Sequence, residues 1–371
     1  MSVASPKVAL VHYWITTWRG GEKVLEALAA IFPDADIYTH VADPAVVAAS
    51  PIKGRNIRTT FIQNLPFASK LYQKYLPLMP IALEQLDLSA YDLVISTESG
   101  PAKGLVLPPD VAHVCYCFTP MRYVWDMYHD YLAHAGWFTR LMMRPLIHYL
   151  RLWDRLSADR VDHFLADSAF VAKRIQRFYR RDATVLYPPI ELQEFQLSTT
   201  DEGFYLVMGA LVRYKKADLA VRAFNEMKLP LVVIGDGELA AEIKAMAGPN
   251  VKVLGRQSRA VILDHYRRCK ALVFPGVEDF GIVPIEAMAT GKPVIAYAKG
   301  GALETVVNGL TGIHFRDQTE ASLIAAVQQF ESGVVCFSPE RIREHAAGFD
   351  MPQFRDKLLG FIREKYPGLQ V

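Results

Sequence analysis

Cysteine, long apolar runs and an excess of charge of one sign are all scarce in this sequence. Its four cysteines, at positions 115, 117, 269 and 336, are too few and too unevenly spaced for a disulfide framework, which indicates a reducing, cytoplasmic compartment. No run of about 18 uncharged apolar residues occurs, so we expect no membrane-spanning helix. We also expect no signal peptide, because the short apolar run after Lys7 leads directly into Thr, Trp, Arg and Gly residues without a cleavage-like segment.

The balance of charge excludes a general nucleic-acid-binding surface. The chain has 41 basic and 39 acidic residues and a formal net charge of +2, whereas nucleic-acid binders carry a clear basic excess. Hydrophobic residues make up 51% of the sequence and charged residues 22%, as is typical of a globular protein. Because 371 residues exceed the length at which one core usually stops growing, we expect two domains.

The order of the apolar segments predicts an α/β fold in both halves of the chain. In the first half, short apolar runs alternate with longer helix-like segments, and the runs lie at residues 7–14, 91–97 and 112–118. In the second half the alternation is clearer, with runs at residues 204–211, 229–237, 251–256, 271–276 and 292–298. Such alternation is typical of parallel sheets covered by helices, so we predict two Rossmann-like, doubly wound domains.

The domain boundary is expected at two adjacent prolines, Pro188 and Pro189, because they exclude a helix and favour an extended connector. We therefore predict an N-terminal domain over residues 1–187 and a C-terminal domain over residues 188–348. The terminal segment, residues 349–371, has helical periodicity of its own. The pattern alone leaves its packing open.

The strongest chemical signal is a pair of glutamates, Glu278 and Glu286, that follows the apolar run 271–276. Pro284 favours a helix start, which predicts Glu278 on a loop and Glu286 inside a helix. In a doubly wound domain, ligands lie beyond the carboxyl ends of the strands, where a helix N-terminus binds phosphate, and residues 281–283 occupy that position. Glu286 is suited to accept hydrogen bonds from ribose hydroxyls and Glu278 from those of a transferable sugar. The alternative for two such acids alone is an ordinary loop and a solvated helix.

The segment FPGVEDFGIVPIEAMATGKPVIAYAKGGALETVVNGLTG, residues 274–312, resembles the donor-binding signature of the family 4 glycosyltransferases of the GT-B fold. The resemblance extends over nearly the whole chain, to residues 19–28, 165–179, 187–189, 209–225 and 232–239. Within that family, YCFTPMRYVWDMYHDYL, residues 116–132, is similar to enzymes that build bacterial surface polysaccharides, many of them mannosyltransferases.

This resemblance implies a retaining hexosyltransferase that takes a sugar from a UDP- or GDP-linked donor, such as UDP-glucose or GDP-mannose. The acceptor implied is a glycan or a lipid-linked molecule. Family members bind the donor mainly with the C-terminal domain and the acceptor with the N-terminal domain, which faces it across a cleft, and their C-terminal helix crosses back onto the first domain. They offset the charge of the leaving diphosphate with side chains and helix ends, so we expect neither a metal nor another cofactor.

The resemblance also assigns candidate site residues. Lys215 falls where the family keeps a phosphate-binding lysine and, with Glu278 and Arg213, makes up the candidate catalytic set. The donor-binding candidates are Gly20, Gly21, Gly209, Arg256, Glu278, Asp279, Phe280, Gly281, Ile282, Val283 and Glu286. The acceptor-binding candidates are Phe118, Arg122, Asp126 and His129, with Asp130 beside them.

Two positions depart from the family pattern. An arginine normally follows the glycine that begins segment 209–225, but here that position is Ala210, and Arg213 is the nearest guanidinium that could reach the same phosphate. Relatives commonly carry a histidine where this chain has Phe118. These departures motivate an alternative function, that of a catalytically weak or inactive nucleotide-sugar-binding relative. A GT-B epimerase or phosphorylase is a second alternative, for which the aromatic segment around Phe118 would be unexpected.

Three further signals have ordinary alternatives. Gly20 and Gly21 lie where the first strand gives way to the first helix, so they form either a tight turn or a close approach to a ligand, and the resemblance favours the ligand. Asp34 and Asp36 form a D-x-D string that we interpret as a surface turn and not as a metal site. Cys115 and Cys117 share one face of a strand but lack further metal ligands, so we predict buried thiols.

The stretch from residue 138 to residue 160 mixes five arginines with Leu, Met and Trp. This composition is compatible with a helix that lies on anionic lipid, and equally with a core helix whose arginines extend to solvent. Because the family often uses lipid-linked acceptors, we predict peripheral contact with an anionic membrane, at the inner face of the plasma membrane. The sequence leaves open the base of the donor, its sugar and the acceptor.

Overall fold

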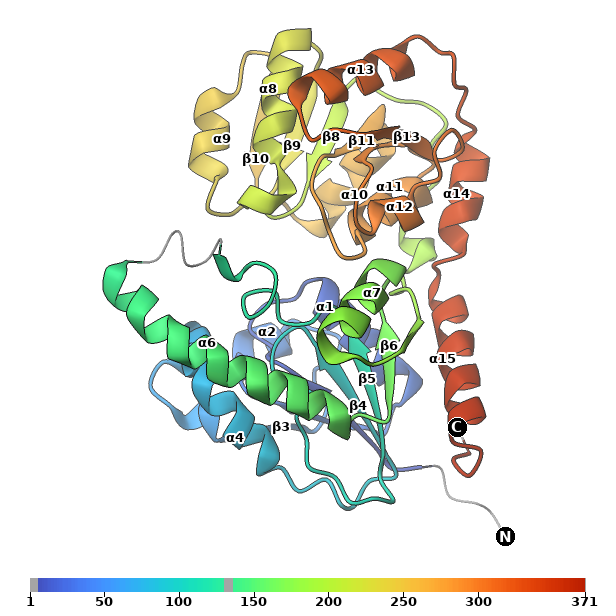
Figure 1. Cartoon of the computed structure of the whole chain (residues 1–371). Coiled ribbons are helices and arrows are strands. Elements are labelled where there is room, and N and C mark those ends of the chain that lie inside the picture. The colour runs from blue at the N-terminus through green and yellow to red at the C-terminus, as the bar shows by residue number, and fades with distance from the viewer. Residues whose placement is uncertain (1–5, 130–135, 371) are drawn as a thin grey trace. The chain divides into compact units, whose positions relative to one another are not determined.

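The computed structural model describes residues 6–129 and 136–370, with only the backbone of residues 138 and 139 (Figure 1). The chain forms two compact units. Unit 1 comprises Met1–Tyr187 and Phe354–Val371, and unit 2 comprises Pro188–Gln353.

Unit 1 is built on a parallel sheet of seven strands. Their order is β3-β2-β1-β4-β5-β6-β7, and every neighbouring pair is parallel. The central strands are buried along their whole length, as expected for a sheet covered on both faces, and they coincide with the predicted apolar runs. The strands are β1 (Val8–His12), β2 (Asp36–Thr39), β3 (Ile57–Thr59), β4 (Leu93–Glu98), β5 (Ala112–Cys117), β6 (His163–Ala166) and β7 (Ala183–Val185).

The described helices of unit 1 connect these strands and cover the sheet. The longest is α6, an amphipathic helix whose buried face contacts a core that includes Ile147, Leu150 and Trp153. The helix α7 begins at a Ser168 side chain that accepts a hydrogen bond from the backbone N–H of Val171. The helices are α1 (Gly20–Ile31), α2 (Pro44–Ala48), α3 (Ala68–Leu71), α4 (Met79–Glu84), α6 (Trp137–Ser157) and α7 (Ala169–Tyr179).

Unit 2 repeats the design with six parallel strands in the order β10-β9-β8-β11-β12-β13. Its core lies between the sheet and helices α8 and α13, which pack against each other. The strands are β8 (Tyr205–Met208), β9 (Leu231–Ile234), β10 (Val251–Gly255), β11 (Ala271–Phe274), β12 (Val294–Tyr297) and β13 (Gly312–Phe315).

The helices of unit 2 follow strands and begin at recognisable residues. Ser258, Thr319 and Ser338 each accept a hydrogen bond from a backbone N–H in the first turn of the helix that follows. The helices are α8 (Ala217–Met227), α9 (Ala240–Met246), α10 (Arg259–Arg268), α11 (Ile282–Ala289), α12 (Ala302–Thr305), α13 (Glu320–Glu331) and α14 (Pro339–Ala347).

The chain returns to unit 1 through α15 (Met351–Lys365). Unit 2 extends to Gln353, beyond residue 348 where the sequence placed its end, because Phe349 and Met351 exchange backbone hydrogen bonds with Ile190. Farther along α15, Phe354 packs edge-on against Tyr116 with 6.0 Å between ring centroids. The prediction of a two-domain, doubly wound GT-B fold is confirmed.

No helix within the described residues is both long and apolar enough to cross a bilayer. The four cysteines are unpaired thiols, of which Cys115, Cys117 and Cys269 are buried and Cys336 is exposed. Burial raises the pKa of the Cys115 and Cys117 thiols, so they are expected to remain protonated.

Candidate functional site

The candidate donor site of unit 2 begins at the point where the strand order reverses. In the sheet, β8 lies between β9, the next strand in sequence, and β11. From β8 the chain therefore runs first to one side of the sheet and later to the other. In doubly wound sheets, ligands bind in the crevice beyond the carboxyl ends of two such strands. The segments that follow β8 and β11 line a small pocket there, whose polar or glycine members are Gly209, Lys215 and Glu278.

Two of the predicted catalytic residues meet at this pocket. The ammonium nitrogen of Lys215 lies 2.9 Å from a carboxylate oxygen of Glu278, and each side chain is 18% exposed. Lys215 ends a short 3₁₀ turn (Arg213–Lys215), whereas Glu278 lies on the loop after β11. A partly buried cation and anion are therefore held together at the switch point.

Glycines allow the two loops to approach each other. A Cβ atom at Gly276 would lie 2.7 Å from the Cα of Lys215, which is closer than real Cβ contacts. Gly209 has a φ of +136°, and a Cβ there would lie 3.3 Å from the Lys215 ammonium nitrogen. A side chain at Gly276 would separate the loops, and one at Gly209 would strain the backbone and crowd the Lys215 ammonium, so the ion pair depends on glycine.

A third loop, not singled out from the sequence, fixes the backbone of Glu278. The N–H of Gly301 donates to the carbonyl of Glu278 at 2.9 Å. Gly300 has a φ of +70°, and a Cβ there would lie 2.5 Å from the same carbonyl oxygen. The two adjacent glycines after β12 were the signal that could have revealed this contact.

The helix α11 begins directly after the loop that carries Glu278. Gly281 precedes the helix with a φ of +85°, which favours glycine, and Ile282 and Val283 form the first turn. The first N–H groups of a helix have no partner within it, and the helix dipole makes this end positive. Residues 281–283 thus form the start of a helix, as predicted, and phosphate binding by them stays a prediction.

Glu286 is the fifth residue of α11 and is engaged on both oxygens. One accepts from Arg259 at 2.8 Å and the other from the Tyr266 hydroxyl at 2.8 Å. Although burial lowers the pKa of Arg259, its pairing with Glu286 and Glu194 raises that pKa overall. A carboxylate has about four acceptor positions, so capacity for ribose hydroxyls remains. Sequence reasoning missed Arg259 and Tyr266, which come from α10.

The other donor candidates have varied surroundings. Arg213 has a side chain that is 66% exposed and lies 3.9 Å from Glu238, and Arg256 is exposed after β10. Phe280 is buried and packs against Phe349, with 5.8 Å between centroids. Asp279 is half-buried beside Glu278.

In unit 1, Gly20 and Gly21 begin α1, as predicted. A Cβ at Gly21 would lie 2.3 Å from the Tyr13 hydroxyl oxygen and 3.5 Å from the Phe118 ring, so Gly21 permits aromatic packing. Gly20 has open space in the corresponding direction. Glu22 is buried and accepts from the backbone N–H of Arg19 at 2.9 Å, which makes it a helix-capping acid.

The described acceptor candidates have different surroundings. Phe118 packs edge-on against Tyr116 and Tyr13. Asp126 forms an ion pair with Arg174 at 2.8 Å, and His129 is exposed beside the Tyr128 ring. Arg122 is half-buried next to this segment, and Asp130 lies outside the described residues.

Among the described residues, no three His, Cys, Asp or Glu side chains lie together so as to hold a metal ion. Of the D-x-D string, Asp36 begins β2 and accepts hydrogen bonds from Tyr91 and Asn56. Asp34 lies in an exposed turn, as the sequence predicted, whereas Asp36 is part of a hydrogen-bond network on a strand.

Residues 190–347 match the family described as "Glycosyl transferases group 1". An uncharacterized glycosyltransferase of Methanocaldococcus jannaschii is 31% identical over 41% of this chain and 44% of its own length. The O-antigen chain mannosyltransferase RfbU of Salmonella typhimurium is 24% identical over 58% of this chain and 64% of its own length. The chain spans about half of the length of the curated relatives that it matches first, from 44% to 64%.

Solved structures are similar over nearly the whole chain. The Anabaena protein HepE, determined in complex with UDP, superposes with a TM-score of 0.70 at 18% identity, covering 96% of this chain and all of that one. At this identity the similarity concerns the fold, and it agrees with the two parallel sheets described above.

Proposed function

We propose that this chain, which belongs to the family 4 glycosyltransferases of the GT-B fold, transfers a hexose from a UDP- or GDP-linked donor to a glycan or lipid-linked acceptor during polysaccharide synthesis. The observation that carries the proposal is the ion pair between Lys215 and Glu278 beside the N-terminus of α11. The proposal includes retention of configuration and no requirement for a metal, both of which the family resemblance implies.

The proposed mechanism follows from where charge develops. Departure of a nucleoside diphosphate leaves negative charge on the leaving oxygens, and preorganised cations and N–H groups stabilise that charge. Lys215 and the first turn of α11 would supply them, since they lie at the ends of adjacent loops. Glu278 would hold the Lys215 ammonium in place and accept a hydrogen bond from a donor-sugar hydroxyl.

The donor nucleotide can be identified by thermal stability. We expect one of UDP or GDP, at about 100 times its dissociation constant, to raise the free energy of unfolding by roughly 2.7 kcal/mol, and ADP to have little effect. The stabilisation should persist with a chelator, because Lys215 and a helix end, not a metal, would bind the diphosphate. Thermal unfolding of the purified chain with each nucleotide measures this. A protein that none of the nucleotides stabilises would contradict the donor site.

The second candidate function is a nucleotide-sugar-binding protein without transfer activity. Ala210 lines the pocket beside Lys215 where relatives keep an arginine, and Phe118 is an aromatic packing residue where relatives keep a histidine. Radiolabelled donor incubated with membrane extract separates the two functions. Both proteins bind the donor, but only the enzyme produces a glycosylated product.

Contact with an anionic membrane is part of the proposal, and the surface of α6 supports it. Exposed apolar residues recur along one line of the helix, at Trp137, Leu141, Pro145, Tyr149, Leu152 and Leu156. Each of the last five directly follows a basic residue, and these are Arg140, Arg144, His148, Arg151 and Arg155. Because successive helical residues are about 100° apart, the helix carries an apolar row and a parallel basic row. The only acid of α6, Asp154, is buried.

We expect the full chain to bind vesicles that contain anionic phosphatidylglycerol and not vesicles of phosphatidylcholine alone. Replacing Arg140 and Arg144 together by Gln should weaken binding about 30-fold, since each basic residue near an anionic surface contributes roughly 1 kcal/mol. Vesicle co-sedimentation measures the effect. The matched control replaces the exposed Arg316 and Arg341 of unit 2 by Gln. Equal binding by both variants, or no binding by the native chain, would eliminate membrane contact through α6.

A further inference from the structure

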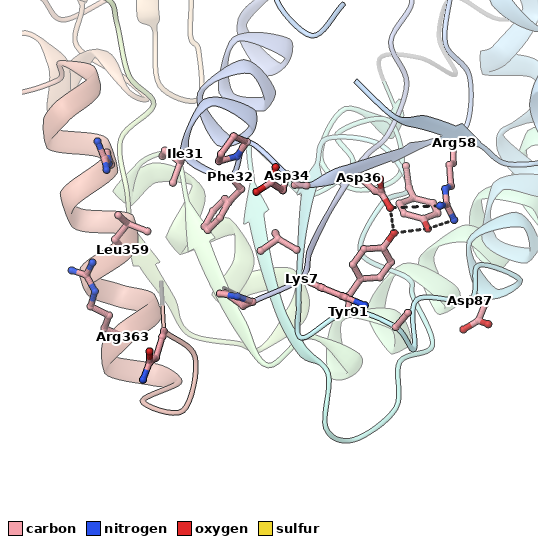
Figure 2. Close-up of a pocket in the computed structure, with 18 residues that line it drawn as sticks. Lys7, Ile31, Phe32, Asp34, Asp36, Arg58, Asp87, Tyr91, Leu359 and Arg363 are labelled. Atoms are coloured by element: carbon pink, nitrogen blue, oxygen red, sulfur yellow. Dashed lines mark hydrogen bonds and ion pairs between the residues drawn. The ribbon is translucent and has the colours of Figure 1, made fainter. Parts of the chain in front are cut away.

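Unit 1 has a pocket of about 800 Å³ that the proposed transfer reaction does not use (Figure 2). It lies where the strands of the seven-stranded sheet begin, with Lys7 just before β1, Asp36 at the start of β2 and Tyr91 just before β4. Ligands of doubly wound domains bind at the opposite, carboxyl ends of the strands, where Gly20 and Phe118 lie in this unit. The pocket is therefore separate from the candidate acceptor residues.

One wall of the pocket is a fixed network of hydroxyl, carboxylate and guanidinium groups. The Tyr91 hydroxyl donates to Asp36 and lies 2.9 Å from the Tyr38 hydroxyl, to which Arg58 donates at 3.2 Å. Asn56 donates to the other oxygen of Asp36 at 2.6 Å. The hydrogen bond from Tyr91, opposed by burial, lowers the pKa of Asp36, so this acid is a charged acceptor. Figure 2 shows Asp36, Arg58 and Tyr91 grouped on this side.

The facing wall is basic and partly apolar. It comes from α15, which contributes Arg355, Leu359 and Arg363, and from the turn after α1, which contributes Phe32. Lys7 lies between the two walls (Figure 2). Eight residues of helix rise by about 12 Å, so Arg355 and Arg363 lie about 12 Å apart along the axis of α15, on either side of Leu359.

The charges of the pocket favour an anionic ligand. It is lined by four basic residues and by three acidic ones, Asp34, Asp36 and Asp87. The charge of Asp36 is offset by Arg58, 3.7 Å away, which leaves Lys7, Arg355 and Arg363 against Asp34 and Asp87. Among the described residues, no hydrogen bond or ion pair joins the charged ends of Lys7 and Arg355 to another side chain. Uncompensated positive charge therefore lies on the α15 side.

We propose that this pocket binds an anionic saccharide. Carboxylate, phenol and guanidinium groups in fixed positions recognise the hydroxyls of a sugar, and the half-buried Tyr91 and Leu359 offer apolar surface beside them. Arg355 and Lys7 bind the phosphate or carboxylate that the saccharide carries. The volume lies within the range of pockets for small ligands. This role rests on the function proposed above: in polysaccharide synthesis the pocket would hold a glycan away from the transfer reaction.

Calorimetric titration of the full chain tests the proposal, with mannose 6-phosphate, glucuronic acid, mannose and inorganic phosphate as probes. One titration is done with saturating UDP or GDP, so that the donor site is filled. A second titration is done without nucleotide, so that the result does not depend on whether the proposed donor site binds a nucleotide. We expect one of the two anionic sugars to bind, and Arg355→Gln with Lys7→Gln to weaken it at least about tenfold. Lys357→Gln, an exposed change on the same helix outside the pocket, should have no effect.

The probes also distinguish the sources of the negative charge. Binding of mannose 6-phosphate alone assigns a phosphorylated sugar, and binding of glucuronic acid alone assigns a uronic acid. Tyr91→Phe should weaken the binding of that sugar without changing the midpoint temperature of thermal unfolding by more than a few degrees. The proposal is overturned if neither anionic sugar binds, if inorganic phosphate binds as tightly as the sugar phosphate, or if binding survives the double substitution.

Discussion

Replacing Lys215 by methionine is expected to lower the turnover number for sugar transfer by a factor of about 100 to 1,000, the usual effect of removing one preorganised group that stabilises transition-state charge. Lys215 is the cation at the switch point of unit 2, 2.9 Å from Glu278. Methionine keeps the length and much of the packing of lysine but removes its charge. Release of nucleoside diphosphate from a radiolabelled donor measures the effect with or without a known acceptor.

The control for this variant is Lys244→Met, which removes an exposed lysine from α9 of the same unit. Arg213→Ala provides a second comparison, because the Arg213 side chain is 66% exposed and lies near Glu238. A turnover number unchanged in Lys215→Met would refute a role for the ion pair in transfer. A loss equally large in Arg213→Ala would indicate that Arg213 replaces the arginine missing at Ala210.

The second large effect concerns stability and a buried charge cluster in unit 1. Lys103, Glu98 and Asp154 are fully buried, and the Lys103 ammonium contacts both carboxylates, lying 3.1 Å from Glu98. Asp154 also accepts from Trp125 at 2.7 Å and from Tyr179 at 2.9 Å. The cluster joins α6 to the end of β4. Removal of its one cation leaves two buried anions close together.

Lys103→Met is therefore expected to lower the free energy of unfolding by about 3–5 kcal/mol, the usual cost of breaking a buried ion pair from one side. Chemical denaturation monitored by circular dichroism measures this loss. Lys23→Met, which removes one partner of an exposed ion pair with Glu26, should cost less than about 1 kcal/mol. Equal effects of the two substitutions would contradict the dominance of the buried cluster.

The pH dependence of Lys103→Met provides an independent check. Burial raises the pKa of Glu98, which Lys103 opposes and Asp154 reinforces, so the variant should raise that pKa further. A carboxyl whose folded pKa exceeds its unfolded value binds an extra proton in the folded state, which favours folding as the pH falls. The destabilisation should therefore be smaller at about pH 5 than at about pH 8. Adding Glu98→Gln should restore part of the lost stability.

The central strands were predictable from sequence because both faces of a parallel sheet are buried, which makes each strand a short apolar run. Strands β1, β5 and β8–β12 fall within the predicted runs, and β4 extends one residue beyond its run, to Glu98. The three-residue strands β3 and β7 were not predicted, because they lie at the sheet edges and carry polar, partly exposed residues. Such short, partly exposed strands lack the continuous burial that produces an apolar run.

The candidate site was predicted as single residues and not as an arrangement. Lys215 and Glu278 were assigned separate partners, the diphosphate and the sugar, yet they contact each other. Their pairing depends on the close approach of backbones at Gly276, which no local pattern encodes. Similarly, the partners of Glu286 come from α10, whose sequence shows only an amphipathic helix. Tertiary contacts between loops and helices set these geometries.

Unit 1 is assembled from two separate stretches of chain, Met1–Tyr187 and Phe354–Val371, with all of unit 2 between them. This has a consequence for biosynthesis. On the ribosome, domains generally fold as they emerge, in order from the N-terminus. Here unit 2 is continuous and complete once Gln353 has emerged, whereas unit 1 still lacks the α15 segment, whose Phe354 and Leu358 are buried. The unit that is synthesised first is therefore the last to finish folding, and a nascent chain stalled after Gln353 carries a complete second unit and an incomplete first one.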